Sequence, residues 1–139
     1  MSLSKIQTID NQVVPNLGRR NLIINGAMQV AQRATSSTGL GTADGYFTLD
    51  RFLMNVGATS AGRFTMSQST VTDLPGFANA LKLECTTADT SIATGEQLTI
   101  DHRIEGQNLQ HFAKGTSSAK AFAVSFYVKG NAAATYACE

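Results

Sequence analysis

The chain has 139 residues, enough for one domain whose hydrophobic core needs neither metal nor disulfide. Its 11 Lys and Arg against 10 Asp and Glu leave a formal net charge of +1, which gives no electrostatic basis for binding nucleic acid or an anionic membrane. No apolar run reaches the roughly 18 residues of a transmembrane helix, and the first residues lack the basic-then-apolar order of a signal peptide. We therefore predict no nucleic-acid partner and no membrane insertion.

The first part of the chain combines a polar leader with an apolar segment. Residues 1–20 are polar, with apolar residues three or four positions apart, and predict an extended arm. A frayed terminus and a segment that attaches to another protein are both compatible with this pattern. Residues 21–33 are apolar around Asn25-Gly26, a favoured tight turn, and predict a strand. Residues 34–45 have no periodicity and predict a loop, either a connector or a binding loop.

Four segments alternate apolar and polar residues with the two-residue period of a pleated sheet. They are residues 46–56, 63–69, 80–87 and 96–104. The predicted core-facing residues are Phe52, Met54 and Val56; Phe64 and Met66; Leu81, Leu83 and Cys85; and Leu98, Ile100, His102 and Ile104. Between them, residues 74–77 carry the Pro-Gly chemistry of a type II turn.

The last third of the sequence holds a short helical pattern and the clearest alternation in the chain. Residues 105–115 predict a helical turn, with Leu109 and Phe112 three apart. Residues 120–129 predict the strongest strand, because Phe122, Val124, Phe126 and Val128 occupy every second position. Residues 132–139 predict the start of a further strand.

Cysteine and histidine give no pattern typical of a metal site. Cys85 and Cys138 are the only cysteines, and both lie in apolar stretches, which predicts reduced and buried thiols, with a disulfide as the alternative. No paired-Cys or paired-His spacing accompanies them. His102 is expected to be a partly buried, hydrogen-bonded histidine.

A set of residues between positions 21 and 52 appears in a specific order. It consists of Asn21, Asn25, Gly26, Gln32, Arg33, Asp50, Arg51 and Phe52, with Tyr46 between its two halves. This order resembles the start of the carbohydrate-binding-module-like jelly-roll domains of phage tail fibres and related virion proteins. Ala34 stands where that family commonly has Gly, and Phe52 where it commonly has Trp. Residues 97–105 and 125–129 resemble the middle strands of the same domains, with Tyr127 at the family's aromatic position.

The resemblance implies a fold, a location and partners. The expected fold is all-β, an antiparallel β-sandwich of jelly-roll type over residues 21–139, preceded by the extended N-terminal arm. Such domains usually run several strands further, so we expect the domain to be incomplete at the C-terminus. The resemblance also implies a virion protein assembled in the host cytoplasm, a homo-oligomer, first of all a trimer, and attachment to other virion proteins through residues 1–20.

The expected function is host attachment through glycan binding, without enzymatic activity. Tyr46, Arg103 and Tyr127 are the candidate glycan-binding residues, since sugars are bound by aromatic faces and planar polar groups. No cofactor and no metal are expected, because the segment after Asn25-Gly26 lacks the carboxylate that a family-type calcium site uses. A purely structural adaptor or decoration protein of the virion is the alternative. A depolymerase, with Asp44 and Asp50 as its carboxylates, has the least support.

Overall fold

The structure is a computed structural model that describes residues 21–58, 61–131, 135 and 137–139. The chain divides into two compact units, Met1–Ile104 and Glu105–Glu139, and each is described by itself. The arm predicted over residues 1–20 lies outside the described residues, as does half of the strand predicted over residues 132–139.

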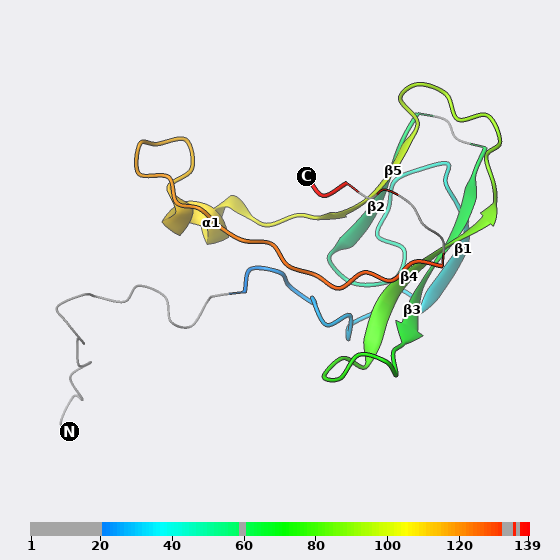
Figure 1. The fold of residues 1–139 in the computed structure, drawn as a ribbon, viewed down its shortest axis with the longest axis horizontal. Coiled ribbons are helices and arrows are strands. Elements are labelled where there is room, and N and C mark those ends of the chain that lie inside the picture. The colour runs from blue at the N-terminus through cyan, green and yellow to red at the C-terminus, as the bar shows by residue number, and fades with distance from the viewer. Residues whose placement is uncertain (1–20, 59–60, 132–134, 136) are drawn as a thin grey trace. The chain divides into compact units, whose positions relative to one another are not determined.

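The first unit contains two antiparallel sheets (Figure 1). In the three-stranded sheet, β3 (Arg63–Thr70) lies between β1 (Ser36–Leu40) and β4 (Asn79–Thr87). The two-stranded sheet pairs β2 (Phe52–Gly57) with β5 (Gln97–His102). The prediction of an all-β fold with antiparallel strands is confirmed at this level.

Both sheets contribute side chains to one hydrophobic core. Met54 of β2 and Met66 of β3 are both fully buried, although they belong to different sheets. The buried cluster consists of Leu40, Leu49, Phe52, Met54 and Met66, and Val56, Phe64, Leu81, Leu83 and Leu98 are among the residues packed against it. The predicted core-facing positions are confirmed for all those of β2 and β3, and for Leu81, Leu83 and Leu98. The prediction is wrong for Cys85 and Ile100, which are exposed, while His102 and Ile104 are half-buried.

β3 and β4 form the longest ladder, and a tight turn joins them. Their pairing runs from Arg63 opposite Thr87 to Thr70 opposite Asn79. In the connection, the N–H of Phe77 donates to the carbonyl of Leu74 at 3.2 Å, and Gly76 has a φ of 89°. A positive φ at this position is what a type II turn requires, so the predicted turn is confirmed.

Two predictions at the start of the chain are wrong. The loop expected over residues 34–45 contains β1, which pairs with β3 through an irregular register between Ser37 and Leu40. The strand expected over residues 21–33 is instead a turn and irregular backbone. Asn25 and Met28 have φ values of 60° and 56°, which no strand accommodates. Polar side chains that bond the local backbone replace the ladder.

The second unit begins with a helical turn, as predicted. α1 (Gly106–Leu109) continues into the 3₁₀ turn η2 (Gln110–Phe112), and the carbonyl of Phe112 accepts a hydrogen bond from the N–H of Lys120 at 2.8 Å.

The strand predicted over residues 120–129 does not form. The four apolar residues that alternate along this segment are 59–67% exposed: Phe122, Val124, Phe126 and Val128. A period of two specifies a face that suits a sheet, but a strand also needs a neighbour that supplies backbone hydrogen bonds. The periodicity of the sequence does not show whether such a neighbouring strand is present.

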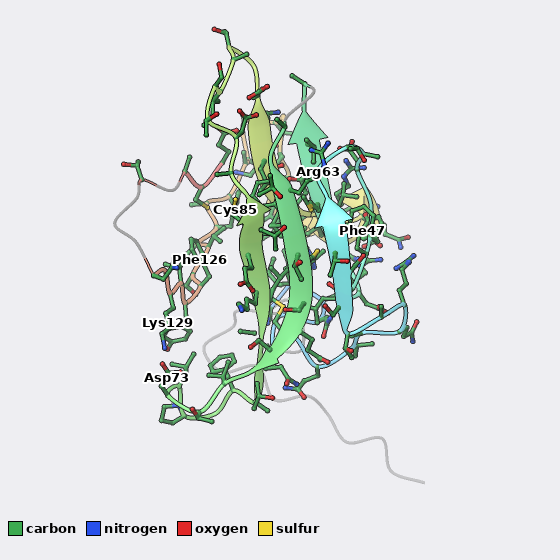
Figure 2. All side chains as sticks on the ribbon, turned by 90° about the vertical axis from the view of Figure 1, so that its right-hand side faces the viewer. Phe47, Arg63, Asp73, Cys85, Phe126 and Lys129 are labelled. Carbon is green, nitrogen blue, oxygen red and sulfur yellow. The ribbon has the colours of Figure 1, made fainter. Side chains whose placement is uncertain are left out.

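Both cysteines are free, as predicted, but the expectation that they are buried is wrong, since both are exposed. Cys85 lies on the core-facing side of β4, an edge strand of its sheet, with its Sγ 3.3 Å from the carbonyl of Thr87 (Figure 2). Because an edge strand has a neighbouring strand on one side only, this thiol remains accessible. No helix in the described part of the chain combines the length and the apolar character needed to cross a membrane.

Candidate functional site

A polar cleft of about 390 Å³ lies in the first unit. It is lined by Gln32, Arg33, Tyr46, Asp50 and Arg51. None of these residues lies in a strand: two precede β1, and three lie between β1 and β2. Four of them belong to the motif found in the sequence, and the fifth is one of the three candidate glycan-binding residues.

Asp50 joins the two segments that form the cleft. Its Oδ1 accepts a hydrogen bond from the backbone N–H of Gln32 at 3.1 Å, and its own N–H donates to the carbonyl of Val30 at 3.1 Å. A carboxylate that accepts a backbone N–H is held in one orientation more firmly than an exposed side chain. The cleft wall is therefore fixed by main-chain contacts on both sides of Asp50.

Asn25 reinforces this junction from the turn that precedes it. Its Nδ2 donates to the carbonyls of Val30 at 2.9 Å and Asp50 at 3.0 Å, and its Oδ1 accepts from the N–H of Val30 at 2.9 Å. All three side-chain hydrogen bonds of Asn25 go to backbone atoms. Asn25 therefore fixes the path of the main chain and does not orient another side chain. This geometry explains why the motif has a short amide at this position.

The turn that contains Asn25 is anchored to the three-stranded sheet. Gln68 of β3 donates through Nε2 to the carbonyls of Met28 at 2.7 Å and Gln29 at 3.2 Å. Asn79 of β4 donates through Nδ2 to Oε1 of Gln29 at 3.3 Å. The sheet thus positions the cleft although no strand residue lines it.

Two arginines give the cleft its charge. The guanidinium carbon of Arg33 lies 5.5 Å from the ring centroid of half-buried Tyr46, a cation–π distance. Arg51 has a φ of 76°, in the left-handed region that side chains other than Gly enter at a cost of about 1–2 kcal/mol. Strained backbone of this kind persists where surrounding contacts enforce it, and it is concentrated at functional sites.

The remaining motif residues have structural roles. Phe52 is buried in the core and makes an edge-to-face contact with His102, with ring centroids 5.2 Å apart. His102 is partly buried, as predicted, and its Nε2 accepts from the N–H of Ile24 at 3.1 Å. Asn21 caps the N–H of Ile23 through its own Oδ1 at 2.9 Å, and Gly26 lies within the turn.

The three predicted glycan-binding residues are not shown to form one site. Tyr46 lines the cleft, whereas Arg103 is not among the lining residues, and its Nη2 lies 4.0 Å from Oδ2 of Asp101. Tyr127 belongs to the second unit and is 74% exposed. The sequence motif predicted only a structural role for Gln32, Arg33, Asp50 and Arg51. Their order in the sequence around Tyr46 is the signal that they share a surface.

The carboxylates do not form a catalytic pair in this cleft. Asp50 is the one carboxylate among the lining residues, and Oδ1 of Asp44 accepts from the N–H of Val56 at 2.7 Å. Cleavage of a glycosidic bond generally uses two carboxyl groups that flank the bond. Within the described residues, no group of three or more His, Cys, Asp or Glu side chains is placed to hold a metal ion.

A second, more apolar pocket of about 270 Å³ lies elsewhere in the first unit. Its walls include Val56, Phe64, Cys85, Ile92 and Leu98, from both sheets and from the connection between β4 and β5. None of the predicted site residues lines it, and it marks where the core is open between the sheets.

Comparison of the chain with protein-family models, with curated proteins and with solved structures gives no match.

Proposed function

We propose that this chain is a non-enzymatic component of a phage virion appendage, with a jelly-roll-type β-sandwich that binds host-surface glycan in the polar cleft. The observation that carries the proposal is the composition of that cleft. It brings Tyr46 together with Gln32, Arg33, Asp50 and Arg51, residues that the resemblance to virion domains had marked separately.

The chemistry of the cleft suits a sugar. A sugar ring presents an apolar C–H face and a rim of hydroxyl groups, and each hydroxyl both donates and accepts hydrogen bonds. Tyr46 offers an aromatic face, Gln32 and Asp50 offer acceptors, and the arginines offer donors. The volume also lies within the range of small-ligand sites, about 300–1,000 Å³.

The proposed protein is a homotrimer, the state that the resemblance to trimeric fibres implies. A polar cleft of this kind is expected to bind one sugar weakly. Several such sites on one oligomer act together, which raises the avidity without new contacts. The exposed apolar row Phe122, Val124, Phe126 and Val128 supports association with further copies of the chain, since four large apolar side chains exposed in one short segment are a common mark of a protein-contact surface.

The test is binding of the purified full chain to a panel of neutral and acidic bacterial surface oligosaccharides. We expect Tyr46→Ala to abolish binding and Tyr46→Phe to retain most of it, because the phenylalanine ring keeps the stacking face. Equal binding by wild-type and Tyr46→Ala protein would place any glycan site outside the cleft.

The alternative is a structural adaptor of the virion that binds no glycan. The observation that favours it is the same exposed apolar row, which suits contact with protein better than with sugar. A folded chain that oligomerises but binds no member of the oligosaccharide panel would establish this alternative.

A further inference from the structure

We infer that residues 120–129 of one chain add as an antiparallel strand to β5 of a second copy, along the edge of β5 that faces away from β2. The inference goes beyond glycan binding, because it assigns a partner to the apolar row Phe122, Val124, Phe126 and Val128. It rests only on the homo-oligomer of the proposed function and names the surfaces that this oligomer buries.

The donor segment has the pattern of a strand that lacks a neighbour. The four residues of the apolar row occupy every second position and are 59–67% exposed, whereas Ala121, Ala123 and Ser125 occupy the positions between them. Residues 121–126 lie in no strand and exchange no backbone hydrogen bond with another described residue. The backbone groups that a ladder needs are therefore available over this stretch.

β5 offers an edge to which such a strand can pair. It belongs to a sheet of two strands, and the outer flank of β2 is already bridged by Gly45, which exchanges two backbone hydrogen bonds of 2.9 Å with Met54. Within the described residues, the backbone of β5 bonds to β2 alone. A sheet of two strands is marginally stable by itself, and a third strand stabilises it.

The pairing of β2 with β5 determines which backbone groups face this edge. Both main-chain groups of Met54 bond to Gly45, away from β5, so Met54 and the opposite Ile100 form a non-hydrogen-bonded pair. The N–H and C=O of Ile100 consequently point away from β2, as do those of Leu98 and His102, two positions to either side. These groups are the donors and acceptors that an added strand meets.

The same edge carries apolar side chains. Ile100 is 36% exposed and Leu98 is half-buried, while Ile24, which is 47% exposed, donates its N–H to His102 at the end of β5. An added strand covers this surface when its apolar row lies on the face of Leu98 and Ile100. The small residues between the members of the row then lie on the face of exposed Thr99.

The exposed area favours a second copy as the partner. The four side chains of the apolar row expose roughly 400–500 Å², given the 150–250 Å² of an aromatic side chain. A copy that donates one strand and accepts another buries this area together with an acceptor surface, which approaches the roughly 800 Å² per partner of a stable interface. Head-to-tail exchange of this kind closes into a ring, as a cyclic homotrimer requires.

Proline substitution tests for backbone pairing. With the apolar row on the face of Ile100, the N–H groups of the row face β5, and those of the residues between them face solvent. We expect Val124→Pro to lower the native mass to that of one chain, because proline removes a ladder donor. Ser125→Pro and Val124→Ala should remain oligomeric. The inference is overturned if Val124→Pro remains oligomeric, or if either control dissociates as fully as Val124→Pro.

Cysteine cross-linking locates the acceptor strand. Cys85→Ser and Cys138→Ser first remove both native thiols, and Thr99→Cys then places one on the outer face of β5. Residues on one face of paired strands have adjacent Cβ atoms, so we expect oxidation to link two chains when a second thiol lies on the outer face of the donor segment. The variants for this face are Ala121→Cys, Ala123→Cys and Ser125→Cys.

Two controls accompany the cross-linking. Val124→Cys lies on the opposite face of the donor segment and should not link to Thr99→Cys. Glu84→Cys replaces Thr99→Cys by an exposed position on β4 and should link to none of the donor positions. Denaturing electrophoresis separates a link between two chains, which doubles the mass, from a link within one chain.

The outcomes separate this inference from the proposed function. A link within one chain, equal linking to Glu84→Cys, or no link at all overturns the inference. An oligomer that forms without the expected links overturns the inference and leaves the homotrimer intact. A monomeric chain that binds glycan overturns both the inference and the homotrimer, while glycan binding stands.

Discussion

The amide Nδ2 of Asn25 donates to the backbone carbonyl of Asp50 at 3.0 Å and joins two segments that are 25 positions apart in the sequence. This contact connects a turn that belongs to no strand to the residue that carries the carboxylate of the cleft. Stability and ligand binding should therefore depend together on one uncharged side chain.

Replacing Asn25 by Ala or Gly separates the contribution of its side-chain hydrogen bonds from that of its left-handed backbone conformation. Asn25→Ala removes the three side-chain bonds and puts a residue that tolerates the left-handed region less well than Asn at a φ of 60°, so we expect a loss of about 2–4 kcal/mol in the free energy of unfolding. Asn25→Gly removes the same bonds but tolerates the φ, and its loss should be smaller by about 1 kcal/mol. Urea-induced unfolding measures the free energy of unfolding of both variants. Equal stability of the alanine variant and wild type would show that the bonds contribute nothing.

Arg51 allows the backbone strain to be measured free of its side-chain contacts. Arg51→Ala and Arg51→Gly both remove the guanidinium, but only Gly adopts a φ of 76° without cost. We expect the glycine variant to be more stable than the alanine variant by about 1 kcal/mol. Thermal unfolding is the measurement, and a more stable alanine variant would mean that the left-handed conformation is not populated.

Thr48 is fully buried, and its Oγ1 has no hydrogen-bond partner within the described residues. Replacing the hydroxyl by a methyl group removes an uncompensated polar atom, so Thr48→Val should raise the free energy of unfolding by about 1 kcal/mol. Thr48→Ser keeps the hydroxyl and loses the methyl, and should be less stable than wild type by a similar amount. A destabilised valine variant would show that the hydroxyl is bonded in solution.

The exposed thiol of Cys85 should react in the folded protein. In a Cys138→Ser background, we expect complete labelling by a thiol-specific disulfide reagent without denaturant, because the sulfur lies at an accessible sheet edge. Labelling that appears only in urea would mean that this side of β4 is covered in solution. Cys85→Ser in the same background is the control for non-specific signal.

The apolar row in residues 120–129 makes the proposed oligomer testable. We expect wild-type protein to show a native mass that is a multiple of the chain mass, and Phe122→Ser with Phe126→Ser to lower it. Ala123→Ser, at an intervening position of the same segment, is the matched control and should leave the mass unchanged. A monomeric wild-type chain would contradict association through this row.

The sequence predicted those strands that have both an alternating pattern and a neighbouring strand to pair with. β3, β4 and β5 alternate clearly, and each pairs with a neighbouring strand, so pattern and structure coincide. β1 was missed because its residues, Ser36–Leu40, are mostly polar and form a strand only through the backbone of β3. Residues 120–129 are the opposite case, a strand that is predicted but does not form. A strong alternating pattern does not specify a partner strand.

The candidate site was predictable in its residues but not in its geometry. Motif order singled out Gln32, Arg33 and Asp50, and aromatic chemistry singled out Tyr46. Their convergence on one cleft depends on the turn around Asn25, which bonds to the backbone of Asp50 and cannot be inferred from residue type or spacing alone. Arg103 was selected for its chemistry alone, and it is not among the residues that line the cleft.

The five cleft residues all lie in connecting segments, while strand residues such as Gln68 and Asn79 anchor the neighbouring turn. Substitutions at the lining positions consequently leave the hydrophobic core and the strand ladders untouched. A protein built in this way can exchange one receptor for another by point mutation without having to evolve a new fold. In the proposed role on a phage appendage, that separation would let sugar recognition change quickly while assembly of the particle stays constant.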